Sequence, residues 1–224
     1  MGINKIKAVI FDLDGVITDT AEYHYIAWKG LANRLGIDFD RAFNEHLKGI
    51  SRMESLALIL EKDNLTERFS KEEKEALARE KNEAYVALIQ DITPRDILPG
   101  ILDFLQDLKG RGIKTAIASA SKNAGSIVEK LEIGHLLDYI ADAGQIPNPK
   151  PAPDIFLVSA EHLSTPPSLC VGIEDAMAGV EAIKAAKMMA VGIGSRAHLK
   201  KADLVLENTA QLTLARIEQA FCRQ

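Results

Sequence analysis

The sequence predicts an α/β protein in which helices cover both faces of a parallel sheet and an all-helical segment is inserted near the amino end. Short apolar runs recur along the chain, and amphipathic helical patterns separate most of them. A strand that is buried on both faces of a parallel sheet has this uninterrupted apolar character. Between residues 18 and 93 the sequence contains no convincing strand but several amphipathic helices, which predicts the insertion.

Five apolar runs are predicted as strands, and they are residues 8–11, 115–118, 169–173, 190–193 and 204–206. A helix that begins near residue 101 has one apolar face and is followed by the stop signals Gly110 and Gly112. Two further helices are predicted around residues 128–131 and 155–163. This alternation of strand and helix places a ligand beyond the carboxyl ends of the strands.

The inserted segment shows two helical patterns. One is a stripe at helical spacing that ends at Gly36 and consists of His24, Trp28, Leu31 and Leu35. The other is a possible capping box of Ser70 and Glu73, which predicts a long charged helix through residue 90. We therefore predict a core domain formed by residues 1–17 and 94–224, and a helical cap domain formed by residues 18–93.

Composition excludes several classes of protein. The chain has 224 residues, of which 27 are basic and 32 acidic, so it lacks the overall positive charge typical of nucleic-acid binding. No apolar stretch approaches the length that spans a membrane, and the apolar run at the amino end stops at Asp12, too early for a signal peptide. Cys170 and Cys222 form no disulfide framework or zinc motif. We expect a reduced, cytoplasmic, monomeric protein without nucleic-acid or membrane partners.

Two pairs of acids follow predicted strands. Asp12 and Asp14 come directly after residues 8–11, and Glu174 and Asp175 come directly after residues 169–173. Like charges this close repel each other, and a bound cation keeps both members of a pair ionised. Ligands that are all oxygen favour Mg²⁺ over zinc. The alternative is that these acids only form a turn or cap the helix that follows.

The ends of the other strands carry groups that suit an anion. Residues 119–123, with the sequence Ser-Ala-Ser-Lys-Asn, follow the second predicted strand and precede a helix. Lys150 lies in a stretch where every second residue is proline, so we predict an extended, stiff loop there. Together with Mg²⁺, these groups can neutralise a phosphoryl group beside a carboxylate. Ordinary helix caps and a solvated surface lysine are the alternatives.

In this order, the segments Asp12-Leu13-Asp14-Gly15, Ser119, Lys150 and Glu174-Asp175 resemble the four loop motifs of the haloacid-dehalogenase-like phosphotransferases. The resemblance covers nearly the whole chain and implies a Rossmann-like α/β core with an inserted cap. Within this family, residues 11–24, 47–52 and 119–123 are most similar to the sugar phosphomutases. The chain departs from that pattern at Met53 and in the prolines before Lys150.

The resemblance implies roles for the residues of the core. Asp12 is implied as the nucleophile that forms an aspartyl phosphate, and Asp14 as the general acid and base. Asp12, Glu174, Asp175 and the backbone carbonyl of Asp14 are implied as ligands of Mg²⁺. Ser119 and Lys150 are implied to hold the oxygens of the phosphoryl group in transfer.

The resemblance also implies a second, non-reacting phosphate site, because a mutase must hold a bisphosphate. Arg52 suits that site, with the loop residues Ala120, Ser121, Lys122 and Asn123 beside it. Lys48, Gly49 and Ser55 are implied to line the sugar, and Thr20 and His24 to couple the position of the cap to Asp14. The alternatives are exposed surface cations for Lys48 and Arg52 and a core histidine for His24.

The expected reaction is the isomerisation of β-D-glucose 1-phosphate and glucose 6-phosphate through β-glucose 1,6-bisphosphate. A sugar-phosphate phosphatase would use the same core residues with water as the acceptor. Dehalogenation is disfavoured, because a neutral organohalide needs neither Asp14 nor the Glu174-Asp175 pair. A phosphorylated receiver-like switch and a sugar-phosphate-binding regulator are the non-enzymatic alternatives. The switch gives the cations of the cap no role, and the regulator predicts binding that is independent of Mg²⁺ and forms no product.

Overall fold

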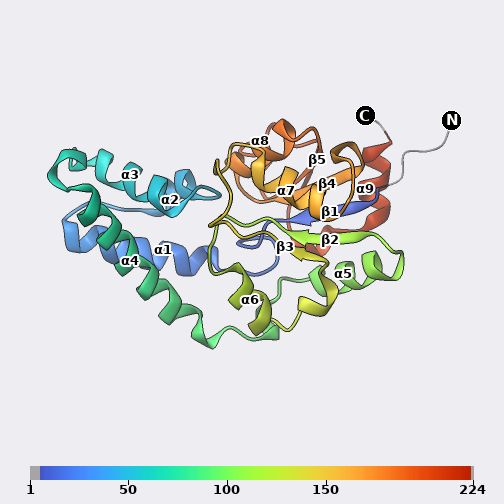
Figure 1. Ribbon diagram of the computed structural model, residues 1–224, viewed down its shortest axis with the longest axis horizontal. Coiled ribbons are helices and arrows are strands. Elements are labelled where there is room, and N and C mark those ends of the chain that lie inside the picture. The colour runs from blue at the N-terminus through green and yellow to red at the C-terminus, as the bar shows by residue number, and fades with distance from the viewer. Residues whose placement is uncertain (1–5, 223–224) are drawn as a thin grey trace.

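A computed structural model describes residues 6–222, which form a six-stranded parallel sheet beside a separate group of helices (Figure 1). The strand order is β3-β2-β1-β4-β5-β6. The strands are β1 (Ala8–Phe11), β2 (Lys114–Ile117), β3 (Tyr139–Ile140), β4 (Cys170–Glu174), β5 (Met189–Ile193) and β6 (Leu204–Leu206). The fold class predicted from the sequence is confirmed.

Helices cover both faces of the sheet. In β1, Val9 and Phe11 belong to the apolar cluster that contains α5 (Ile101–Gly110), α6 (Ala124–Lys130) and α9 (Leu214–Phe221). Ala8 and Ile10 belong to the opposite cluster, with α7 (Asp154–His162) and α8 (Met177–Ala185). Since alternate residues of a strand point to opposite faces, both sides of β1 must be apolar, which explains its uninterrupted apolar run.

The predicted strands agree with the structure to within one residue at each end. The runs at 8–11 and 204–206 match β1 and β6, and the other three are shifted or extended by one residue. The sequence analysis missed β3 and α9. Strand β3 has only two residues, both half-buried, so it leaves no apolar run to detect. The proline-rich segment is free of helix until α7 begins at Asp154, as predicted.

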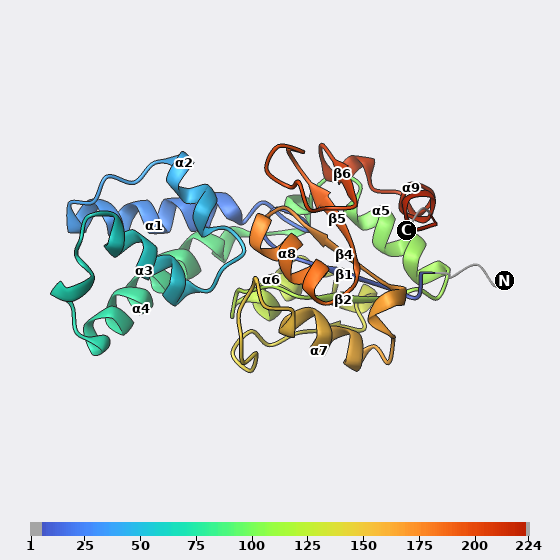
Figure 2. The same ribbon diagram turned by 90° about the horizontal axis from the view of Figure 1, so that it is seen from above.

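Residues 21–88 form four helices, which are α1 (Ala21–Leu35), α2 (Arg41–Asn44), α3 (Arg52–Lys62) and α4 (Lys71–Leu88). Their apolar faces meet in a cluster of their own, which includes Trp28, Leu31 and Leu60. Gly36 ends α1 in the left-handed conformation with φ of 76°. The predicted capping box of Ser70 and Glu73 begins α4. Figure 2 shows this helical group as a body beside the sheet.

Two crossings of the chain connect the helical group to the sheet, and they are hydrogen-bonded to each other. Thr18 and Ile97 form an antiparallel bridge, and the Leu98 N–H donates to the Ile17 carbonyl over 2.9 Å. The Thr18 hydroxyl donates to the Asp96 carbonyl over 2.7 Å. Near this junction Tyr85 of α4 packs into the apolar cluster of the sheet. The helical group is therefore joined to the sheet at one place, where the two crossings are hydrogen-bonded to each other.

Both cysteines of the chain are free thiols. Cys170 is buried in β4, where burial raises the pKa of its thiol to about 11, and Cys222 is exposed. A buried thiol of this kind packs as a small apolar side chain. Within residues 6–222, none of the helices has the length and apolar character needed to cross a bilayer.

The contact between β4 and α8 depends on a glycine. A Cβ atom at Gly172 would lie 2.5 Å from Cγ1 of Ile183, which is closer than side chains pack. We expect Gly172→Ala to lower the free energy of unfolding by about 1–3 kcal/mol, measured by urea unfolding. Gly125→Ala in α6 is the control, because a Cβ there meets open space. Equal stability of the two variants would contradict this reading of the packing.

Candidate active site

Three carboxylates converge at the carboxyl ends of the neighbouring strands β1 and β4. Asp12 follows β1, Glu174 ends β4 and Asp175 comes next, and each offers an oxygen within 4.8 Å of the others. Strands β1 and β4 are paired in parallel, which brings these two distant segments together. The side chains of Asp12 and Glu174 are buried, and that of Asp175 is 15% exposed. The sequence predicted that the two acidic pairs lie at one edge of the sheet, and three of these four residues, Asp12, Glu174 and Asp175, come together there.

Lys150 lies between two of these acids. Its Nζ is 2.6 Å from Oδ1 of Asp12 and 2.7 Å from Oε1 of Glu174, and its side chain is 1% exposed. Burial alone would lower the pKa of Lys150, but the two carboxylates more than offset this, so the pKa is raised. The alternative of a solvated surface lysine is wrong. The proline-rich loop directs the lysine inward.

The acids outnumber the ammonium. Burial raises the pKa of Glu174 to about 7 against the opposing effect of Lys150, and burial and the charge of Glu174 raise the pKa of Asp175 well above its usual value. When all three carboxylates are ionised, they and the one ammonium carry two net negative charges, so the ionised forms need a further cation. A divalent cation with oxygen ligands fits this charge and this donor set. Glu174 also accepts the Ala176 N–H over 2.7 Å, so it caps the start of α8 as well.

Asp14 points away from the other acids and toward the helical group. It accepts a hydrogen bond from the Thr20 hydroxyl, and its Oδ2 is 3.4 Å from the Ser119 hydroxyl. His24 Nε2 lies 3.8 Å from Asp14 Oδ1. Burial and the charge of Asp12 raise the pKa of Asp14 to about 6. A carboxyl group with this pKa can give and take a proton near neutral pH.

The loop after β2 contains the predicted polar cluster. Ser119 is fully buried and accepts the Ser121 N–H over 3.0 Å, while Ser121 accepts the Asn123 N–H over 3.2 Å. These bonds form turns within the loop, and neither serine is the N-cap of α6, which is Asn123. The loop nevertheless reaches the site, because Ala120, Ser121 and Lys122 line the cavity described next.

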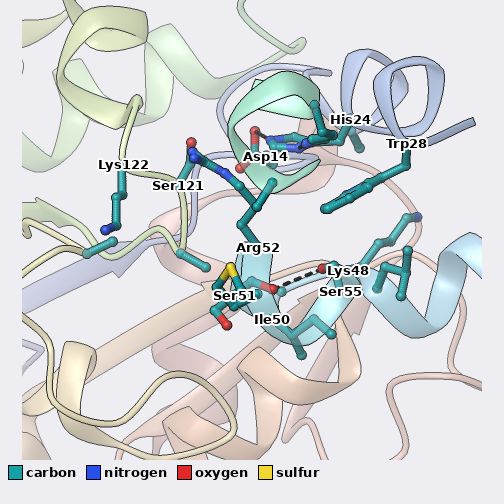
Figure 3. Close-up of a pocket in the computed structure, with 18 of the residues that line it drawn as sticks. Asp14, His24, Trp28, Lys48, Ile50, Ser51, Arg52, Ser55, Ser121 and Lys122 are labelled. Carbon is teal, nitrogen blue, oxygen red and sulfur yellow. Dashed lines mark hydrogen bonds and ion pairs between the residues drawn. The ribbon is translucent and has the colours of Figure 1, made fainter. Parts of the chain in front are cut away.

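A cavity of about 460 Å³ lies between the two bodies, which is a size suited to a small molecule (Figure 3). Asp12, Asp14 and Asp175 line it from the sheet. The helical group lines it with Trp28, Lys48, Gly49, Arg52 and Ser55. Of the residues that the sequence analysis placed at a sugar or phosphate site, all line this cavity except Ser119, Asn123 and Lys150.

The loop before α3 approaches the acids closely. Lys48 Nζ is 2.9 Å from Glu45 and 3.9 Å from Asp175. Gly49 has φ of 75°, and a Cβ atom there would lie 3.0 Å from Ala176. The Ser55 hydroxyl donates to the Ser51 carbonyl over 3.0 Å, as Figure 3 shows. The exposed-cation interpretation is therefore wrong for Lys48, which is partnered and faces the site.

Sequence reasoning missed Lys81 of α4. Its Nζ is 2.6 Å from His24 Nδ1 and lies over the rings of Trp28 and Tyr85. Burial, and then Arg52, lower the pKa of Lys81 to about 7. Burial and Lys81 also hold the pKa of His24 well below its usual value, so this ring is neutral. One signal was available, because Leu77, Lys81 and Tyr85 are spaced four residues apart on one buried face.

Asn82 was also missed. Its Oδ1 accepts from Arg52 Nη2 over 2.7 Å and from Asn123 Nδ2 over 3.0 Å. Asn82 therefore accepts hydrogen bonds both from a residue of the helical group, Arg52, and from a residue of the sheet body, Asn123. An asparagine on a highly charged helix gives no sequence signal for this.

Comparisons with known proteins agree with this geometry. A profile of the haloacid dehalogenase-like hydrolases matches residues 6–187. The chain is 48% identical to β-phosphoglucomutase of Bacillus subtilis over 96% of both chains. It is 32% identical to fructose-1-phosphate phosphatase of Escherichia coli, over 84% of this chain and 97% of that one.

A solved structure extends the similarity to the arrangement of the two bodies. The crystal structure of β-phosphoglucomutase from Clostridium difficile is 54% identical and superposes with a TM-score of 0.94. The match covers 97% of this chain and 98% of that one. Sequence and structure agree over nearly the full length, and the chain belongs to the haloacid dehalogenase-like family.

Proposed function

We propose that this protein is a Mg²⁺-dependent isomerase that interconverts β-D-glucose 1-phosphate and D-glucose 6-phosphate. The proposed intermediates are an aspartyl phosphate on Asp12 and β-D-glucose 1,6-bisphosphate. The observation that carries the proposal is the similarity to two β-phosphoglucomutases, which extends through the cap as well as the core. The phosphatase relative is more distant, at 32% identity.

Asp12 is the proposed nucleophile. Its carboxylate attacks one phosphorus of the bound bisphosphate, the P–O bond to the sugar breaks, and the phosphoryl group becomes an acyl phosphate on Asp12 while a sugar monophosphate leaves. Lys150, 2.6 Å from this carboxylate, offsets the repulsion between two anions, and Ser119 helps to hold the moving group. Asp12, Glu174, Asp175 and the Asp14 carbonyl would hold Mg²⁺, which neutralises phosphoryl oxygens when bound.

Asp14 is the proposed general acid and base. It protonates the sugar oxygen that leaves when the bisphosphate phosphorylates Asp12, and it accepts the proton of the sugar-monophosphate hydroxyl that attacks the acyl phosphate in the transfer back. Thr20 holds one carboxylate oxygen of Asp14, and His24 lies beside the same oxygen. Lys81 holds His24 from the other side of its ring, so the cap positions the acid through His24.

The remaining cavity residues are the proposed sugar-phosphate site. Arg52 and Asn123, which converge on Asn82, bind the non-reacting phosphate together with Ser121 and Lys122. Lys48, Gly49, Ser55 and Ala120 line the sugar. Arginine suits this position because its planar fork binds phosphate through two parallel hydrogen bonds.

The proposal includes the division into a core of residues 1–17 and 94–224 and a cap of residues 18–93. Closure of the cap about the junction of Thr18 and Ile97 excludes water, so that the acyl phosphate waits for a sugar hydroxyl. One chain supplies the whole cavity, which supports a monomer. The free thiols support a reduced, cytoplasmic setting.

The function is tested with Mg²⁺, β-glucose 1-phosphate and a trace of glucose 1,6-bisphosphate, by comparing glucose 6-phosphate formed with inorganic phosphate released. We expect sugar product to exceed phosphate by at least about tenfold, because the closed cap excludes water. Asp12→Asn should lower turnover by about 10⁴-fold and leave no acyl phosphate. Dominant phosphate release would instead identify a phosphatase, and near-normal turnover of the variant would refute the nucleophile.

Arg52→Ala should weaken the use of the bisphosphate selectively. Loss of a charge-assisted hydrogen bond is expected to lower kcat/KM for glucose 1,6-bisphosphate by roughly 10- to 100-fold. Phosphorylation of Asp12 by acetyl phosphate, which lacks a second phosphate, should change by less than about twofold. Arg68→Ala, a cap variant outside the cavity, is the control. An equal loss with both donors would contradict the second phosphate site.

Lys81→Met should change how stability depends on pH. The pKa of Lys81 is lowered from 10.5 to about 7 in the folded protein, so the unfolded chain binds the extra proton between these values. The wild-type free energy of unfolding should therefore rise with pH, by about 2 kcal/mol more than that of the variant between about pH 7 and 9. Urea unfolding measures this, with the exposed Lys71→Met as control. Parallel pH profiles of wild type and Lys81→Met would contradict the buried cation.

A further inference from the structure

The cavity extends beyond the residues to which the proposed reaction gives a role. Along α4 it is also lined by Glu75, Ala78 and Arg79, and at the start of α3 by Met53. Arg79 is exposed, so its side chain meets both the cavity and the solvent. A cation at such a place is encountered by an incoming anionic ligand before the buried residues are.

Arg79 is not used to stabilise its own helix. Glu75 and Glu83 lie four residues before and after it, at the spacing that favours ion pairs on a helix. Within residues 6–222, however, Arg79 forms no ion pair within 4.0 Å and no hydrogen bond. Three exposed arginines do pair with acids; Arg34, Arg41 and Arg111 contact Glu80, Glu22 and Asp107, whereas Arg68, Arg95 and Arg216, like Arg79, form no ion pair within residues 6–222. The guanidinium of Arg79 therefore keeps its full capacity for an anion.

The position of Arg79 on α4 connects it to the phosphate site. Three residues further along the helix is Asn82, which accepts a hydrogen bond from Arg52 over 2.7 Å. Residues three apart are neighbours on a helix face, with a rise of about 4.5 Å. Arg79 thus lies one turn away from the point at which Arg52 and Asn123 converge.

We propose that Arg79 is a further recognition residue of this cavity, which attracts the sugar bisphosphate and raises its rate of association. The choice of a sugar bisphosphate as ligand rests on the proposed function. An exposed cation at the wall of a cleft increases the local concentration of an anionic ligand, and salt screens this effect. Arg79 does not touch the reacting atoms, so it acts on kcat/KM and leaves kcat unchanged.

The test measures kcat/KM of β-glucose 1,6-bisphosphate for phosphorylation of the enzyme, followed as the sugar monophosphate released in that step, in wild type, Arg79→Ala, Arg79→Lys and Lys74→Ala. At about 20 mM salt we expect Arg79→Ala to lose roughly fivefold, and at about 500 mM salt less than twofold. Arg79→Lys keeps the charge and should stay within about twofold of wild type. Lys74 lies on the same helix outside the cavity lining, so Lys74→Ala should behave as wild type.

The inference is overturned if Arg79→Ala equals wild type at low salt, if its loss does not depend on salt, or if kcat falls. Lys74→Ala showing the same loss would also overturn it, because the effect would then come from net charge alone. Phosphorylation of the enzyme by the bisphosphate precedes the choice of acceptor, so this step is measured whether a sugar or water then accepts the phosphoryl group. A failure of the proposed isomerase function would therefore appear only in the ratio of glucose 6-phosphate to inorganic phosphate, and the Arg79 test would still stand.

Discussion

The buried ammonium of Lys150 is the interaction on which the site depends. It lies within 2.7 Å of both Asp12 and Glu174, which come from different strands. A buried carboxylate is costly without a partner, and two of them side by side are more so. By pairing with both, Lys150 fixes the proline-rich loop against β1 and β4 and allows acids to be packed where a parallel sheet would otherwise hold apolar residues.

The cap contributes side chains to the site that the sheet body does not supply. The acids, Ser119 and Lys150 belong to the sheet body, and such a set alone can pass a phosphoryl group to water or to a sugar. The cap brings Arg52 to the cavity and places His24, held by Lys81, beside Asp14. The sheet body therefore holds the acids and the buried lysine, while the helical group supplies the side chains that complete the cavity wall.

The sequence predicted most of the fold because its strands are buried on both faces and leave apolar runs. It missed β3, whose two half-buried residues leave no such run. The meeting of Asp12 with Glu174 and Asp175 was predictable, since the carboxyl ends of parallel strands share one edge. Lys81 and Asn82 were not found, because their partners His24 and Arg52 lie on other helices and only tertiary packing joins them. The one sequence signal for a functional role of Lys81 was that this charged residue lies on a helix face that is otherwise buried.

The bridge between Thr18 and Ile97 has a mechanical consequence. Two separate linkers would let the helical body slide and twist, but crossings tied to each other restrict it to a swing about one axis. Asp14 is only four residues from Thr18, whereas Lys48 and Gly49 lie on the loop of the helical group that faces Asp175 and Ala176. A small rotation about the bridge therefore moves that loop across the opening of the cavity while the carboxyl group of Asp14 shifts much less, so the opening can change without realigning Asp14.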